Sequence, residues 1–370
     1  MSFASTVIGT AERVPLPDVI IRAAIHRLCS RAAARLATGN AESDAWFADA
    51  MAARAIAECS GAVDARQSEV PAAFFAHVLG PNRKFSSGFY KEPASTLQEA
   101  EEEALRQTVE HADLADGQSI LELGCGWGSL SLWMARQFPQ SLVTAVSNSD
   151  SQREYIESEA ARRGLANLRV VTQDMNLFAP DTRFDRIVSV GMFEHVGRQN
   201  YETFFGKCRD LLTHNGVMLL HTIGRWDGPA HTNAWVWRYI FPGGYTPALS
   251  ELAPVIERSG LIVSDVEVLR IHYADTLRAW RNNFLANRNE VVRLFEETPD
   301  LRSRFGNAER FIRMWEYYLA GFEASFRYYG LVVFQIQLIK NIDAVPLTRD
   351  YMYARGRNVP SAAKLAEAAE

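Results

Sequence analysis

The sequence predicts an α/β protein with a Rossmann-like, mostly parallel sheet of seven strands. Short apolar runs rich in β-branched residues alternate with helical stretches from residue 118 onward. This alternation is typical of parallel strands joined by crossover helices. A glycine-rich loop also follows the first run, as it does in sheets that bind nucleotides at their carboxyl edge. The length agrees with this, because 370 residues can bury the core of one large domain.

The expected strands follow one another along the chain. They are SILEL (119–123), LVTAVS (142–147), LRVVTQD (168–174), RIVSVG (186–191), VMLLHTI (217–223) and LVVFQIQLI (331–339), and the last run returns to the sheet as its final strands. Helices are expected at residues 130–137, 151–163 and 201–212. The second helix follows Ser149 and Asp150, which suit an N-cap, and it stops at Gly164.

Two further segments flank or interrupt this pattern. Within residues 17–63, apolar side chains recur at helical spacing opposite arginines, which predicts amphipathic helices. Packing on the main domain is the favoured interpretation, and a surface for lipid or a second subunit is the alternative. Residues 225–330 are helical in pattern and crowded with aromatic side chains, so we expect them to form a helical cap over the substrate.

Composition excludes several classes of protein. A hydrophobic content of 48% and a charged content of 22% are ordinary for a globular protein. A formal net charge of -5 gives no basic surface for nucleic acid. Cys29, Cys59, Cys125 and Cys208 lack CxxC spacing, and the histidines lack metal-ligand spacing, so neither a metal site nor a disulfide framework is expected.

The same residues give an expectation for location. The first residues show no signal-peptide pattern, and no apolar run reaches the roughly 18 residues of a spanning helix. We therefore expect a cytoplasmic protein whose membrane contact, if it makes one, is peripheral at the inner membrane surface.

The loop after the first strand, in SILELGCGWG, predicts a nucleoside site. Gly124 and Gly126 let the backbone approach a ligand, and Gly128 permits close packing of the next helix. Position 129 is a serine, so the longer glycine fingerprint of dinucleotide enzymes is absent. Together with Glu122 on the strand, this pattern favours S-adenosylmethionine over a nicotinamide cofactor.

Polar residues at the next two strand ends extend this prediction. Ser147, Asn148 and Gln152 follow the second strand and are candidates for the ribose hydroxyls. After the third strand, Asp174 can accept a hydrogen bond from the adenine amino group, and Met175 can offer its amide and an apolar face. Ordinary strand-end turns are the alternative interpretation.

Five segments carry a family resemblance. KFSSGFYKEPASTLQEAEE, ILELGCGWGSLSLWMA, SVGMFEHVGRQNYETFF, LLHTIG and WRYIFPGGYTP resemble the cyclopropane-fatty-acyl-phospholipid synthase family, over roughly residues 69–351. The resemblance implies a Rossmann-like class I methyltransferase that moves a methyl or methylene group from S-adenosylmethionine to the double bond of an unsaturated acyl chain. It also implies a domain organisation, with an N-terminal helical region at 1–80, a methyltransferase domain at 81–355 and a tail at 356–370.

The resemblance further implies site residues. In this family a bound bicarbonate removes a proton from the methylated chain, and the matching positions here are Glu194, His221, Tyr273 and Ser87, with Ser86 beside the cofactor. Ser87 departs from the pattern, because the family usually has cysteine there. A serine amide can still bind an anion, so bicarbonate stays an expected ligand, and the product is a ring or a branch.

A second family competes for the substrate. FSSGFYKEPASTLQEAEE, DGQSILELGCGWGSLSLW and VSNSDSQREYIE resemble the coclaurine-type N-methyltransferases, which methylate amines. The C-terminal third favours the acyl branch, so the leading prediction is an unsaturated acyl lipid and the alternative is a small amine. A homodimer is left open, and a binding protein without turnover is the third hypothesis.

Overall fold

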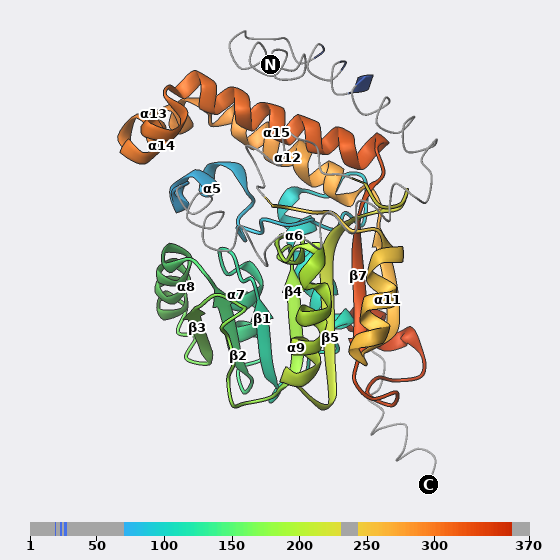
Figure 1. Cartoon of the computed structure of the whole chain (residues 1–370). Coiled ribbons are helices and arrows are strands. Elements are labelled where there is room, and N and C mark those ends of the chain that lie inside the picture. The colour runs from blue at the N-terminus through green and yellow to red at the C-terminus, as the bar shows by residue number, and fades with distance from the viewer. Residues whose placement is uncertain (1–18, 20–22, 24–25, 28–69, 231–242, 357–370) are drawn as a thin grey trace.

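The core of the protein is a seven-stranded sheet (Figure 1). The computed structural model describes residues 19, 23, 26–27, 70–230 and 243–356. The strands are β1 (Ser119–Leu123), β2 (Leu142–Ser147), β3 (Leu168–Thr172), β4 (Phe184–Val190), β5 (Leu212–Arg225), β6 (Ile262–Leu269) and β7 (Leu331–Ile339). Their order is β3-β2-β1-β4-β5-β7-β6, and β7 runs antiparallel to both of its neighbours while the other pairs are parallel. The predicted fold class is confirmed.

Helices cover both faces of the sheet. In chain order they are α5 (Ala72–Val78), α6 (Leu97–His111), α7 (Ser129–Gln137), α8 (Asp150–Arg162), α9 (Tyr201–Leu211), α11 (Leu249–Ser259), α12 (His272–Ala286), α13 (Arg288–Glu297), α14 (Pro299–Phe305) and α15 (Ala308–Tyr328). Successive residues of a strand point to opposite faces. Leu121 and Leu123 accordingly pack in one core with α9 and α11, whereas Ile120 packs with α6 and α7.

An aromatic-rich helical layer lies over the carboxyl edge of the sheet. Figure 1 shows α12 and α15 running side by side there, with α5 between them and the sheet. Trp280, Phe284 and Phe311 are fully buried in this layer, and Phe74 of α5 packs against the two phenylalanines. The predicted aromatic helical cap is thus present. None of the described helices is long and apolar enough to cross a bilayer.

One part of the expected cap is not helical. Residues 262–269 form the edge strand β6, although the whole segment 225–330 was expected to be helical. The reason is that most of β6 is exposed or only half-buried, so polar residues such as Asp265 and Glu267 interrupt any apolar run. A strand that is buried on one face alone has no continuous apolar segment, so its sequence does not stand out as a strand.

Other expectations fall outside the described residues. Most of the helical region expected at 17–63, the tail after residue 356 and the YIFPGG motif at 239–244 lie wholly or largely among residues that the structure does not describe. Among the described N-terminal residues, His26 is helical, and its carbonyl oxygen accepts a hydrogen bond from the Tyr329 hydroxyl at 2.9 Å. The proposed domain boundaries stay predictions.

The start of α6 gives a test of local stability. Thr96 Oγ1 accepts a hydrogen bond from the Glu99 amide at 3.2 Å, and the Glu99 carboxylate accepts one from the Thr96 amide at 2.8 Å. Because this reciprocal cap satisfies two amides at the helix start, we expect Thr96→Ala to lower the free energy of unfolding by about 1 kcal/mol. Urea denaturation measures this change. Ser95→Ala is the control, and equal midpoints for the two variants would contradict the prediction.

Candidate active site

The glycine loop after β1 is fixed between two neighbouring strands. The amides of Gly124 and Cys125 both donate to the carbonyl oxygen of Val146 on β2, at 3.0 and 3.1 Å. On the other side, a Cβ placed on Gly124 would lie 2.5 Å from the Cβ of Met192, just after β4. Only glycine fits there, and its φ of +81° also lies in the left-handed region. The loop therefore sits at the carboxyl edge, where ligands of such sheets bind.

The next two glycines differ in their surroundings. A Cβ on Gly128 would lie 2.6 Å from a side-chain carbon of Ile156, so glycine lets the start of α7 pack closely against α8. A Cβ on Gly126 would meet no atom within 4 Å, and the φ of Gly126 is +51°. Gly126 therefore exposes backbone to open space at the place where a nucleoside is expected.

The residues expected at ribose and adenine lie on the adjacent strand ends. Ser147 Oγ donates to Gln152 Oε1 at 2.7 Å, so these two ribose candidates are already in contact, whereas Asn148 is exposed. Asp174 Oδ1 accepts from the Asn176 amide at 2.8 Å, and Met175 lies beside it. The Gln173 amide bonds the Ser147 carbonyl at 2.8 Å and joins the two groups. Their arrangement fits S-adenosylmethionine, and the individual roles stay predictions.

The loop that carries Ser86 and Ser87 lies against the end of β4. A Cβ on Gly191 would be 3.8 Å from that of Ser86. Ser87 is fully buried, and its hydroxyl donates to the Gly88 carbonyl at 2.8 Å. The Gly88 amide in turn donates to Thr276 Oγ1 on α12 at 2.9 Å, which ties the loop to the helical cap.

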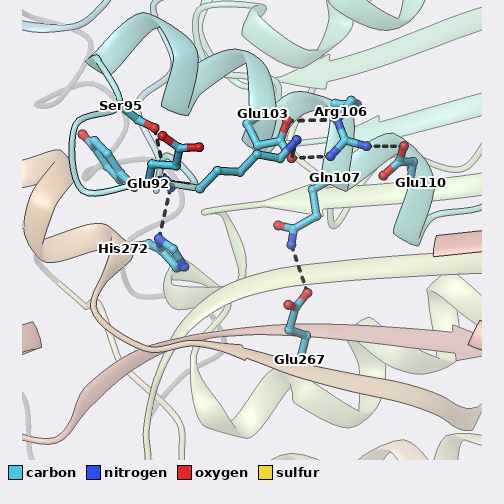
Figure 2. Close-up of polar contacts among 10 residues, drawn as sticks. Glu92, Ser95, Glu103, Arg106, Gln107, Glu110, Glu267 and His272 are labelled. Atoms are coloured by element: carbon cyan, nitrogen blue, oxygen red, sulfur yellow. Dashed lines mark hydrogen bonds and ion pairs between the residues drawn. The ribbon is translucent and has the colours of Figure 1, made fainter. Parts of the chain in front are cut away.

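Contacts further along the same loop strengthen this attachment, as Figure 2 shows. The Tyr90 amide donates to His272 Nδ1 at the start of α12, at 3.1 Å. Lys91 pairs with Glu103 of α6 at 2.8 Å, and Arg106 bonds the same carboxylate. The loop is thus attached to α12 of the cap and to α6, which packs on one face of the sheet. These contacts position the site residues that the loop carries.

A buried lysine supports the same loop from within. Lys84 Nζ donates to Ser86 Oγ at 2.5 Å and to the Ser87 carbonyl at 2.7 Å. Burial lowers the pKa of Lys84 to about 8, while the charges of Glu101 and Glu122 act in the opposite direction. Burial likewise raises the pKa of Glu122 to about 8, although Ser131 and Lys84 favour its ionised form. Lys84 and Glu122 therefore each influence the pKa of the other, and burial brings both pKa values to about 8.

Glu194 has one oxygen free at the end of β4. Its Oε1 accepts a hydrogen bond from the Ile223 amide at 2.6 Å, but its buried Oε2 has no hydrogen-bond partner among the described residues. Burial raises the pKa of Glu194 to about 7, against the effects of Ile223 and the Thr222 hydroxyl. A carboxyl group with this pKa and a free oxygen is suited to proton transfer.

His221 and Tyr273 complete the set expected from the family resemblance. His221 lies on β5, and its Nδ1 contacts Gln335 Nε2 at 3.1 Å. Burial and the charge of Lys84 lower the pKa of His221, so the ring is neutral. Burial raises the pKa of Tyr273, and the charges of Tyr318 and Glu194 raise it further. Glu194 bonds the Ile223 amide of β5, the strand that carries His221, and the Ser86–Ser87 loop lies against the end of β4. Tyr273 lies on α12, the cap helix to which Gly88 of the same loop is bonded.

Lys84 and Gln335 were missed by sequence reasoning. Both are nearly fully buried and contact the expected site residues Ser86, Ser87 and His221. A lysine next to polar residues looks like a surface residue, so only its place before the motif FSSGFY could have drawn attention to Lys84. Gln335 lies inside an apolar strand, where a buried amide needs a partner, and this was the available signal. In the described part of the chain, no cluster of His, Cys, Asp or Glu could hold a metal ion.

Comparison with known proteins identifies relatives of this arrangement. Residues 63–336 match the family model described as mycolic acid cyclopropane synthetase. The cyclopropane-fatty-acyl-phospholipid synthase of Escherichia coli is 31% identical over 274 residues, which are 73% of this chain and 65% of that protein. The chain therefore matches somewhat less than two thirds of the length of that relative.

Solved structures agree with the sequence comparison. A coclaurine N-methyltransferase bound to N-methylheliamine and S-adenosylhomocysteine is 27% identical, with a TM-score of 0.78 over 91% of this chain and 99% of that one. A mycolic acid cyclopropane synthase with S-adenosylhomocysteine and CTAB is also 27% identical, with a TM-score of 0.64 over 74% of this chain and 95% of that one. Both resembled families are therefore represented among its structural neighbours.

Proposed function

The chain belongs to the mycolic acid cyclopropane synthetase family, and from that premise we propose that it is an S-adenosylmethionine-dependent methyltransferase. We propose further that it transfers a methyl or methylene group to the double bond of an unsaturated fatty acyl chain. The observation that carries this proposal is the buried Glu194 carboxyl, which keeps one oxygen without a hydrogen-bond partner among the described residues while the Ile223 amide holds the other.

The residues of the site suit this chemistry. When bound, S-adenosylmethionine supplies an electrophilic methyl group, and the protein must bring the double bond into line with it. Methylation of an alkene leaves a cation on the substrate carbon, which an aromatic face can stabilise by about 2 kcal/mol in a dry site. Tyr273 has Phe326 at 4.8 Å and Trp280 at 5.8 Å between ring centroids, so such faces are at hand.

A proton must then leave the methylated chain. The free oxygen of Glu194 can take it directly or through a bound bicarbonate. The groups available to hold that anion are the Ser87 amide, a ring N–H of His221 and the Tyr273 hydroxyl. The buried ammonium of Lys84, which bonds the Ser87 carbonyl, adds favourable charge for an anion at this place.

A small amine is the second candidate substrate. The similarity to the coclaurine N-methyltransferase over 91% of the chain favours it, because the helical cap is included in that match. We place the acyl chain first because the 31% identical relative from Escherichia coli, matched over 73% of this chain, is a cyclopropane-fatty-acyl-phospholipid synthase.

One labelling experiment separates the candidates. The pure full-length protein is incubated with methyl-labelled S-adenosylmethionine and either vesicles of unsaturated phospholipid or a panel of secondary amines, and products are identified by mass. We expect label in the lipid, with a gain of one CH₂ for either a ring or a methylene branch. Label only in amines would reject the lipid proposal. Tight cofactor binding without any product would favour a binding protein.

The pH dependence of the rate tests the role of Glu194. A base must be ionised to accept a proton, and burial raises the pKa of Glu194 to about 7. We therefore expect kcat to fall about tenfold for each pH unit below that value and to level off above it until Lys84, whose pKa is about 8, loses the charge that favours the anion. A pH–rate profile with saturating cofactor checks this. A profile that is flat between pH 5 and 7 would exclude Glu194 as the base.

A further inference from the structure

A row of polar side chains leads from the edge of the sheet to the site histidine. Glu267 on β6, Gln335 on β7 and His221 on β5 are direct register partners across three neighbouring strands. All three therefore lie on the same face of the sheet. His111, at the end of α6, lies over this face and contacts two members of the row.

The contacts in this row are continuous. His111 Nδ1 is 3.3 Å from Glu267 Oε2 and 2.9 Å from Gln335 Oε1. The other end of the same amide, Gln335 Nε2, is 3.1 Å from His221 Nδ1. Gln335 is 2% exposed, so its amide bridges the two rings inside the protein.

The carboxylate of Glu267 determines which atoms donate and which accept along this row of hydrogen bonds. Glu267 Oε2 already accepts a hydrogen bond from Gln107 Nε2 at 3.1 Å, as Figure 2 shows. An anionic oxygen beside His111 Nδ1 favours a proton on that nitrogen. A protonated Nδ1 must face an acceptor, which is the Gln335 carbonyl oxygen. The amide nitrogen of Gln335 then donates to His221 Nδ1, which must be unprotonated.

We propose that Gln335 is a positioning residue that holds His221 in the tautomer with the proton on Nε2, and that Glu267 sets this choice through His111. Burial lowers the pKa of both histidines, that of His111 to about 4, so each neutral ring carries one proton. No described residue forms a hydrogen bond with Nε2 of His221. The consequence is a ring that offers an N–H, and not a lone pair, to an anion in the site.

The usefulness of that N–H rests on the proposed function, but the tautomer does not. It is measured directly in the wild-type protein, from the two-bond ¹H–¹⁵N correlations of its eight histidines after ¹⁵N labelling. The His221 signals are assigned by their loss in His221→Asn. We expect the Nε2–H pattern for His221 and the Nδ1–H pattern for His111. An Nδ1–H pattern for His221 would overturn the proposal.

Substitutions test the cause. Gln335→Glu keeps the shape but presents an acceptor to both rings, so we expect His221 to switch to the Nδ1–H pattern. We expect kcat to fall about 100-fold, with the cofactor KM changed less than threefold. A switched tautomer with unchanged kcat would leave the positioning role intact and count against the role of His221 in the proposed function. Glu267→Gln is expected to populate both tautomers, and an unchanged pattern would remove Glu267 from the proposal.

The matched control lies two residues along the same strand. Gln337 is equally buried, and its amide donates to the His111 carbonyl and accepts from Ser264 and Tyr351, but it does not contact His221. We expect Gln337→Met to lose stability like Gln335→Met while His221 keeps its Nε2–H pattern. Only Gln335→Met should then mix the two tautomers of His221. If both variants changed the His221 signals equally, a merely structural effect would explain them and the proposal would fail.

Discussion

Replacement of Glu194 by glutamine is expected to lower the rate of product formation by a factor on the order of 10³ and to leave the affinity for S-adenosylmethionine nearly unchanged. The glutamine side chain has the same shape, and its carbonyl oxygen can still accept from the Ile223 amide, so the local fold is kept. What is lost is the free oxygen that can take up a proton. Single-turnover assays and calorimetric titration measure the two quantities separately.

Glu110→Gln is the matched control for this variant. Glu110 is also a buried glutamate, but it pairs with Arg106 of the same helix, α6 (Figure 2). We expect Glu110→Gln to cost some stability and to keep its activity. A Glu194→Gln variant with ordinary turnover would remove this carboxyl from the mechanism.

Replacement of Gly126 by leucine is expected to lower the affinity for S-adenosylmethionine by about 100-fold or more, equivalent to about 2.7 kcal/mol. The side chain would point into the open space beside the loop, where we expect the nucleoside. Calorimetric titration of the variant with S-adenosylhomocysteine measures the loss.

Gly117→Leu is the control that separates the conformational cost of a leucine at positive φ from the loss of space for the nucleoside. Gly117 also has a positive φ, of +88°, and open space around its Cβ position, but it is an exposed turn residue before β1. Both leucines therefore pay a similar conformational cost of about 1–2 kcal/mol. Only Gly126→Leu should lose binding. Equal affinities in the two variants would show that the nucleoside does not lie against Gly126.

The parts of the fold that sequence alone predicts are those with a strong local signal. The strands β1, β2, β4 and β7 are largely buried on both faces, so they appear as mainly apolar runs with few polar residues, and glycines mark the turn after β1. The edge strand β6 has no such signal, because one of its faces is exposed. Burial of a whole strand is visible in the sequence, but its place at the edge of a sheet is not.

The residues of the candidate site also fall into those that the sequence predicts and those that it does not. Glu194 and His221 follow or end predicted strands within motifs, so their gathering at one edge could be expected from topology. Lys84 and Gln335 act through partners that only the folded chain brings close. The amide of Gln335 meets His221 across a separation of 114 residues and His111 across 224. No local spacing encodes such a pairing.

The antiparallel strand β7 also has a consequence for biosynthesis. It occupies the place between β5 and β6 but leaves the ribosome after both of them. Until residue 339 has emerged, the nascent chain presents two unpaired strand edges with apolar side chains, which are templates for association with other chains. Cells that make this protein should therefore depend on chaperone protection late in its translation, and a ribosome stalled before residue 331 should release an aggregation-prone product.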